Sequence, residues 1–128
     1  MGRVLVADDE THIVQVLALK FRNAGLDVLE ASDGEQALDL AREFQLDAIV
    51  TDVQMPFMNG IELAGALLKD PQLQNIPVLV LTARGWSMDE SLQGLSNVRT
   101  VLNKPFSPRA VLAEVMSLID VDRERLAA

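Results

Sequence analysis

The sequence predicts an α/β fold in which helices cover both faces of a five-stranded parallel sheet. Short β-branched runs alternate with longer segments of helical period, which is the pattern of such a doubly wound sheet. The chain has 128 residues, about one domain's length, and 49% hydrophobic against 23% charged residues, as in folded domains. We therefore expect one domain over residues 1–121 and a C-terminal tail at 122–128.

Five segments have the composition of strands. Val4–Ala7, Ala48–Thr51 and Val78–Leu81 are continuous apolar runs, as expected of central strands buried on both faces. Charged or polar residues interrupt the other two segments, Asp27–Ala31 and Val98–Leu102. We expect these two at the edges of the sheet, where one side meets water.

A helix is expected after each strand. Apolar residues recur at helical spacing in the first, at Ile13, Leu17, Phe21 and Ala24. The second is expected over about 34–44, behind Ser32 and Glu35, which have the spacing of a capping box. Asn59 and Glu62 predict the start of the third in the same way.

The last two helices differ in strength. The fourth, expected to begin at Ser87 with Glu90, is short and poor in strong helix formers, so we expect it to be mobile. The fifth begins at Ser107-Pro108, a capping hydroxyl followed by a proline suited to the first turn. Its apolar stripe is Val111, Leu112, Val115, Leu118 and Ile119.

Composition excludes several classes of protein. The net charge of −8 repels phosphate backbones and anionic lipids, so we expect no direct binding of nucleic acid or membranes. The absence of cysteine excludes disulfides and thiolate metal sites and fits a reducing compartment. Apolar runs such as Val78–Leu81 are too short to span a membrane, and carboxylates follow the N-terminus too soon for a secretory signal. We expect a cytoplasmic protein.

Polar side chains follow four of the predicted strands: Asp8 and Asp9, Asp52, Thr82 and Lys104. The carboxyl ends of parallel strands share one edge, so these groups should converge there. Crowded carboxylates repel one another, and Mg²⁺ is the hard cation that relieves such repulsion with oxygen ligands. A lysine and a hydroxyl beside it can hold phosphoryl oxygens. This pattern predicts a site for phosphoryl transfer.

Each of these residues also has an ordinary structural interpretation. Asp8 and Asp9 could cap the first helix, and Asp52 could be a turn residue. Thr82 could be a strand-end hydroxyl and Lys104 a solvated surface charge. Their coincidence at one predicted edge favours the functional interpretation.

The chain resembles the receiver domain of bacterial two-component response regulators, including single-domain chemotaxis regulators, from Arg3 to about Ile119. The matching residues are Asp8-Asp9, Asp52, Met55-Pro56 with Asn59-Gly60, Leu81-Thr82-Ala83 and Lys104-Pro105-Phe106. The resemblance implies a flavodoxin-like strand order of 2-1-3-4-5. In that family the bond at the position of Lys104-Pro105 is often cis.

The resemblance further implies a signalling phosphoacceptor rather than an enzyme. Asp52 would take a phosphoryl group from a phosphohistidine of a sensor kinase or phosphotransfer protein. Asp9, Asp52 and the backbone carbonyl of Gln54 would bind Mg²⁺, with Asp8 acting through a water. The phosphoryl oxygens would then meet three further groups: the Lys104 ammonium, the Thr82 hydroxyl and the Ala83 backbone N–H. The face formed by the fourth helix, fifth strand and fifth helix would bind a downstream protein.

The sequence departs from the family at Val101, where members usually carry the Tyr or Phe that swings inward after phosphorylation. The chain has no tyrosine, so we expect a muted or altered shift of the fourth helix and fifth strand.

Three other functions fit the sequence less well. A haloacid-dehalogenase-like phosphatase needs an Asp where Gln54 stands, a receiver-like module without phosphorylation would not need the five-residue set, and a flavodoxin-like carrier needs aromatic residues to stack its flavin.

Overall fold

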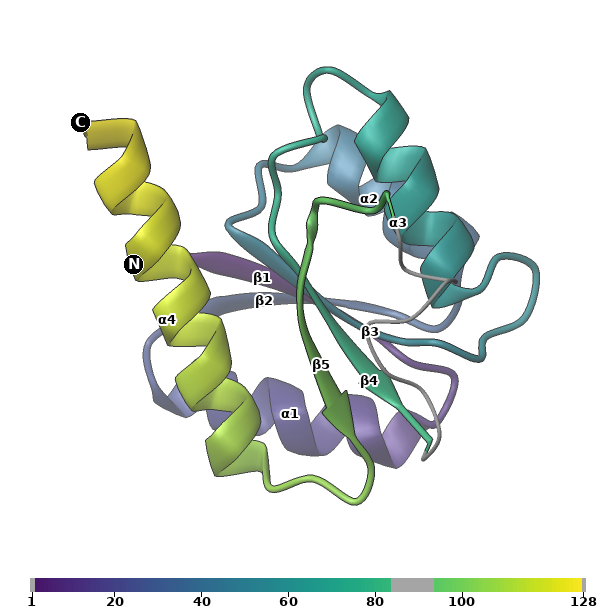
Figure 1. Cartoon of the computed structure of the whole chain (residues 1–128). Helices are drawn as coiled ribbons and strands as arrows, with labels where there is room; N and C mark the ends of the chain where they lie inside the picture. Colours follow the sequence, from purple (N-terminus) through teal and green to yellow (C-terminus); the bar gives the residue numbers. More distant parts are fainter. Residues whose placement is uncertain (1, 84–93, 128) are drawn as a thin grey trace.

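The computed structural model describes residues 2–83 and 94–127 and shows a five-stranded parallel sheet (Figure 1). Its strands are β1 (Arg3–Ala7), β2 (Asp27–Ala31), β3 (Ala48–Asp52), β4 (Val78–Thr82) and β5 (Val98–Asn103). Their order is β2-β1-β3-β4-β5, and every pair is parallel. The predicted fold class, the strand order and the two edge strands are therefore confirmed.

Helices cover both faces of the sheet. The described helices are α1 (Thr11–Asn23), α2 (Gly34–Glu43), α3 (Gly60–Lys69) and α4 (Pro108–Ala127). α1 and α4 pack on one face, and α2 and α3 pack on the other (Figure 1). The helix α4 is the fifth helix of the sequence prediction. The expected fourth helix falls almost entirely in residues 84–93, which lie outside the described residues.

Alternating side chains of the strands divide the core into two clusters, because successive residues of a strand point to opposite faces. Leu5 and Ile49 pack under α2 and α3, whereas Val6 and Val50 pack under α1 and α4. All five residues of β3 and of β4 are buried. The face of α1 is rotated slightly from the prediction, since its buried residues are Val14, Leu17, Ala18 and Phe21. Buried apolar side chains thus pack on both faces of the sheet.

The helix caps agree with the sequence at two places and differ at one. Asn59 and Glu62 form the expected capping box at α3, and the Ser107 hydroxyl accepts a hydrogen bond from the Ala110 N–H at α4. The predicted box at Ser32 is wrong. Asp33 caps α2 by accepting a bond of 2.8 Å from the N–H of Gln36, because a carboxylate one residue nearer the helix reaches its free N–H groups.

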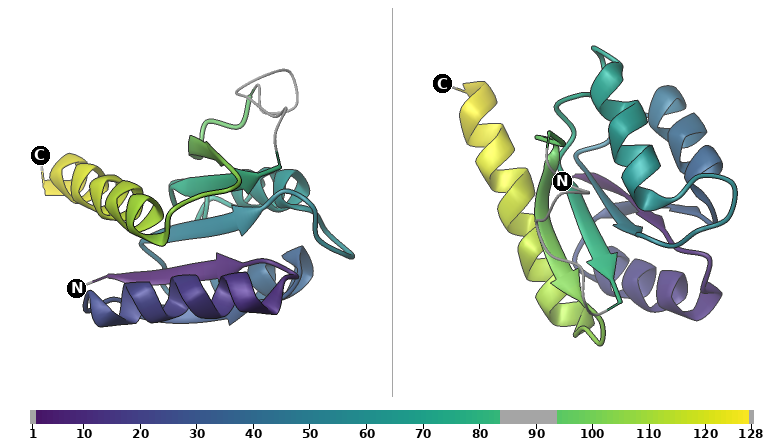
Figure 2. Two further views of the ribbon diagram at one scale, coloured as in Figure 1. Left: turned by 90° about the horizontal axis from the view of Figure 1, so that it is seen from below. Right: turned by 45° about the vertical axis from the view of Figure 1, so that its right-hand side comes forward.

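The helix α4 continues to Ala127 and projects beyond the sheet (Figures 1 and 2). Its backbone therefore includes the segment that the sequence suggested as a tail, while the domain boundary at residue 121 stays a prediction. In the part of the chain that the structure describes, no helix is both long and apolar enough to cross a membrane.

Candidate functional site

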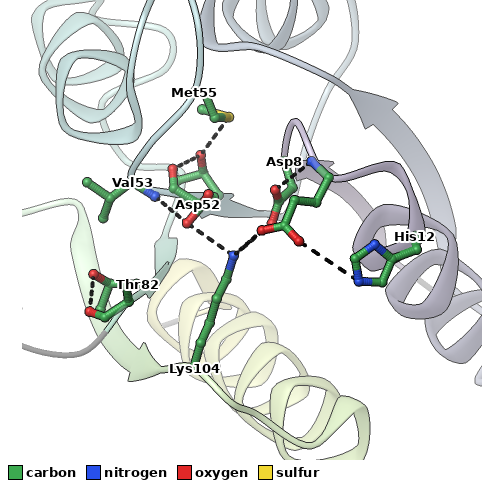
Figure 3. A network of polar contacts seen from close by, with 10 residues as sticks. Asp8, His12, Asp52, Val53, Met55, Thr82 and Lys104 are labelled. Carbon is green, nitrogen blue, oxygen red and sulfur yellow. Dashed lines mark hydrogen bonds and ion pairs between the residues drawn. The ribbon is translucent and has the colours of Figure 1, made fainter.

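Charged side chains gather where three strands, β1, β3 and β5, reach their carboxyl ends (Figure 3). Asp8 follows β1, Asp52 ends β3, and Lys104 follows β5. A bulge aligns the last of these: β5 contains one residue more than β4 between the pairs Val78–Val98 and Leu79–Thr100, so that Asn103 pairs with Thr82. Groups almost a hundred residues apart in the chain thus meet at one place, as the sequence predicted.

The Lys104 ammonium lies between carboxylates (Figure 3). Its Nζ is 3.4 Å from Oδ2 of Asp8, 3.4 Å from Oδ1 of Asp52 and 3.6 Å from Oε1 of Glu10. The lysine backbone is fixed because its N–H donates a bond of 2.7 Å to the Thr82 carbonyl. One cation is therefore shared by three anions, each at the long end of contact distances.

Burial raises the pKa values of two of these carboxyls, Asp8 and Asp52. Asp8 and Asp52 are 1% and 6% exposed. Loss of hydration, followed by repulsion from Asp8, raises the pKa of Asp52 to about 6, although Lys104 opposes the rise. Loss of hydration also raises the pKa of Asp8. Burial lowers the pKa of Lys104, but the combined attraction of the surrounding carboxylates outweighs it and leaves this pKa above its ordinary value.

Three carboxylates form a cluster that could hold a cation. Asp8, Asp9 and Asp52 each offer an oxygen, and these oxygens lie within 4.8 Å of one another. Asp9 is exposed, whereas the other two are buried. An all-oxygen donor set whose buried members resist ionisation is what a small hard dication fits, because its charge offsets both the burial and the repulsion. The residues present therefore fit Mg²⁺.

The backbone around Asp52 fixes its side chain. Its Oδ1 accepts a hydrogen bond of 2.9 Å from the N–H of Val53. The start of α3 approaches closely, since the N–H of Gly60 donates a bond of 2.8 Å to the Val53 carbonyl. A Cβ at Gly60 would lie 2.2 Å from the Asp52 carbonyl oxygen, so only glycine fits there. The strand end and the helix start together hold the carboxylate in place.

The remaining predicted residues lie around this centre without forming a polar contact with Asp52. Thr82 is fully buried, and its hydroxyl donates a bond of 2.9 Å to the Ala83 carbonyl (Figure 3). Ala83 and Gln54 are exposed on the loops after β4 and β3. The Lys104-Pro105 peptide bond is cis, as the resemblance implied.

Sequence reasoning missed Glu10. This residue follows the acidic pair directly, and its side chain reaches the same lysine as Asp8 and Asp52. A third consecutive carboxylate at the start of α1 was the signal that could have identified it. The site therefore contains four acidic side chains, not three.

Known proteins are similar in both sequence and structure. The sequence profile described as the response regulator receiver domain matches residues 4–116. The chain is 38% identical over 117 residues to the alkaline phosphatase synthesis transcriptional regulatory protein PhoP of Bacillus subtilis, covering 91% of this chain and 48% of PhoP. The chain thus spans about half the length of this curated relative.

Two solved structures match over nearly their whole length. The Francisella response regulator 1452 receiver domain is 37% identical with a TM-score of 0.84, over 94% of this chain and 98% of that one. Chemotaxis response regulator CheY4 of Vibrio cholerae is 31% identical with a TM-score of 0.84, over 92% and 98%. The converging strand ends, the acidic cluster with its lysine and these similarities agree: the chain belongs to the response regulator receiver domain family.

Proposed function

We propose that Asp52 accepts a phosphoryl group from a phosphohistidine of a sensor kinase or phosphotransfer protein. An oxygen of the Asp52 carboxylate bonds to phosphorus while the phosphorus–nitrogen bond breaks, and the imidazole nitrogen keeps that electron pair. The nucleophile is the anion and needs no general base above the raised pKa of Asp52, about 6. The observation that carries the proposal is the Asp52 carboxylate 3.4 Å from the Lys104 ammonium, within the acidic cluster.

Other residues of the chain would bind the transferred group. The Lys104 ammonium would pair with its oxygens, and the Thr82 hydroxyl and Ala83 N–H would donate to them. Thr82 would first turn from the Ala83 carbonyl that it now contacts.

Asp9, Asp52 and the Gln54 carbonyl would hold Mg²⁺ directly, and Asp8 would hold it through a water. Bound there, the ion would neutralise negative charge on the carboxylates and on the phosphoryl oxygens. The donor set supports this assignment, because two of its carboxylates are buried beside one shared ammonium.

The chain would act in signalling rather than as a turnover enzyme. Gln54 stands two residues after the nucleophile, where a haloacid-dehalogenase-like phosphatase would need an acid. A downstream protein would bind the face that includes β5 and α4. PhoP is named a transcriptional regulatory protein, but this chain spans about half of it, so the absence of direct nucleic-acid binding stays a prediction. The cytoplasmic location also stays a prediction.

Val101 supports a further proposal about the switch. It is half-buried on β5, in the position where family members usually carry an aromatic residue. Without that ring, phosphorylation would shift β5 and the expected fourth helix less than usual. Backbone amide NMR with and without beryllofluoride, a phosphoryl mimic, tests this. Large shifts spread evenly over all helices would contradict it.

One experiment tests the phosphoacceptor. The protein is incubated with acetyl phosphate and Mg²⁺, and its mass and free phosphate are followed. We expect a single acid-labile adduct that Asp52→Asn abolishes and that the exposed matched variant Asp39→Asn retains. If Asp52→Asn still forms the adduct, another residue is the acceptor. Rapid turnover of varied phosphomonoesters would favour the phosphatase, and the absence of both adduct and metal binding would favour a receiver-like module without phosphorylation.

A further inference from the structure

Glu10 occupies a helix-cap position without capping the helix. It is the N-cap residue of α1, with extended backbone angles, yet its side chain accepts no capping hydrogen bond. Ser, Thr, Asp and Asn are preferred there because their short side chains reach the free N–H groups of the first turn. Local helix stability therefore does not account for the placement of this glutamate.

The backbone of Glu10 is nevertheless fixed. Its N–H donates a bond of 2.9 Å to Oδ1 of Asp8, and its carbonyl accepts bonds from the N–H groups of Ile13 and Val14. The side chain extends toward the site, with Oε1 3.6 Å from Nζ of Lys104. Its other oxygen lies 3.9 Å from Nε2 of His12, whose side chain is 76% exposed. The short contact with a partly buried group is thus the one with Lys104.

The charges at the site make Glu10 different from the other three acids. Asp8, Asp9 and Asp52 form the cluster that could hold a dication, and Lys104 supplies one further positive charge. A bound dication and the Lys104 ammonium would together balance the charges of these three acids. The Glu10 carboxylate, whose side chain is 51% exposed, is then the excess anion. A phosphoryl group adds about one further negative charge at Asp52 and needs the same ammonium.

We propose that Glu10 is a positioning residue that holds the Lys104 ammonium in the unmodified protein and weakens the affinity of the site for a phosphoryl-like anion. The reason is competition for one cation combined with repulsion between like charges. The proposal rests on the proposed function, since it assumes an anion bound at Asp52. It also predicts effects of opposite sign on the two ions, because the charge of Glu10 attracts Mg²⁺ while repelling the anion.

Beryllofluoride and Mg²⁺ are the probes that separate these effects. Mg²⁺ is titrated alone, and beryllofluoride is titrated at saturating Mg²⁺, both followed by backbone amide NMR of the whole chain. Glu10→Gln should bind beryllofluoride about three- to fivefold more tightly and Mg²⁺ about twofold more weakly, the range expected of a partly exposed charge. Added salt should reduce both differences, because it screens exposed charges.

Two matched variants serve as controls. Glu43→Gln, on the exposed surface at the end of α2, changes the net charge equally and should leave both affinities near wild type. Glu10→Asp keeps the charge on a side chain that is too short to keep the contact with Lys104 and can cap α1 instead, so its affinities should fall between those of the wild type and Glu10→Gln. If Glu10 had a purely structural role, Glu10→Gln would instead bind both beryllofluoride and Mg²⁺ more weakly.

The outcomes separate the two proposals. If the wild type binds no beryllofluoride, or Asp52→Asn binds it as well, the phosphoacceptor proposal fails and the role of Glu10 fails with it. If the wild type binds it through Asp52 but Glu10→Gln equals Glu43→Gln, or both affinities change in the same direction, only the role of Glu10 is overturned. If Glu10→Gln binds beryllofluoride more tightly and Mg²⁺ more weakly than the wild type, the proposed role of Glu10 is supported.

Discussion

The carboxylates at the two ends of the sheet are paired in different ways. At the amino end, Arg3 pairs with two acids: its Nε lies 2.7 Å from Oδ2 of Asp27, and its backbone N–H donates a bond of 2.8 Å to Asp47. Its guanidinium also lies 5.3 Å from the centre of the Phe44 ring. At the carboxyl end, three carboxylates share one ammonium at 3.4 to 3.6 Å.

This contrast separates stability from function. Each carboxylate at the amino end has a donor at hydrogen-bond distance, so these contacts stabilise the fold directly. At the carboxyl end, Asp8 and Asp52 are buried and crowded, so folding raises the pKa values of these two carboxyls and is less favourable at neutral pH. Such destabilising charge is typical of binding sites, where a ligand restores the balance.

The largest effect is expected from closing the space beside Asp52. Gly60→Ala would place a Cβ 2.2 Å from the Asp52 carbonyl oxygen, so the strand end or the helix start must shift. We expect a loss of about 3 kcal/mol in the free energy of unfolding, together with the loss of Mg²⁺ binding. Denaturant unfolding and metal titration measure the two.

Gly65→Ala is the matched control, because the atom nearest its new Cβ is Leu95 Cδ2, 4.0 Å away. Its free energy of unfolding should rise by up to about 1 kcal/mol, because alanine is more favourable than glycine inside a helix. Equal effects of the two substitutions would mean that the close approach to Asp52 does not constrain the site.

Removing the buried charge should stabilise the carboxyl end. The pKa of Asp52 is raised from 3.8 to about 6, so the folded state holds the proton more tightly than the unfolded state. The wild type therefore loses stability as the pH rises from about 4 to about 6. Asp52→Asn avoids this loss. We expect its free energy of unfolding to exceed that of the wild type by on the order of 2 kcal/mol at pH 7.5 without metal.

Urea unfolding between pH 4 and pH 8 measures this difference, which should disappear toward pH 4. Saturating Mg²⁺ should reduce it as well, since metal binding stabilises the wild-type fold. The exposed variant Asp39→Asn should show neither effect. A less stable Asp52→Asn at neutral pH would show that the ion pair with Lys104 outweighs the burial.

The same type of change should have the opposite sign at the amino end. Asp47→Ala removes the acceptor of the Arg3 N–H, and we expect a loss of about 1 kcal/mol. Asp47→Asn retains an acceptor oxygen and should remain close to wild type. Thermal unfolding in parallel with Asp52→Asn gives the comparison directly, and a stabilising Asp47→Ala would remove the distinction between the two ends.

The smallest effect concerns the loop between β3 and α3. Among the described residues, Phe57 is the non-glycine residue with positive φ, at 69°, and the residue is 81% exposed. Phe57→Gly relieves the strain but gains entropy in the unfolded chain, so we expect a net gain of about 0.5 kcal/mol. Phe57→Ala keeps a Cβ and should not show this gain in the same unfolding assay.

Local pattern was sufficient for the elements whose signal is local. The apolar runs of β3 and β4 identified buried strands, and Asn59 with Glu62 identified the start of α3. The cap of α2 was misplaced by one residue, from Asp33 to Ser32, because Ser and Asp are equally good caps and only the actual helix start distinguishes them. Long-range pairing, such as the bulge that aligns Lys104, has no local signal.

The sequence alone determined the fold class, the strands and the residues that converge at one edge, because side-chain period and strand order follow from local chemistry and chirality. Tertiary structure decided how those residues interact. It placed Lys104 among three carboxylates, buried Asp52 enough to raise its pKa, turned Thr82 toward Ala83 and brought Glu10 to the lysine. Distances and burial depend on packing between elements far apart in the chain, and electrostatic interactions depend on both.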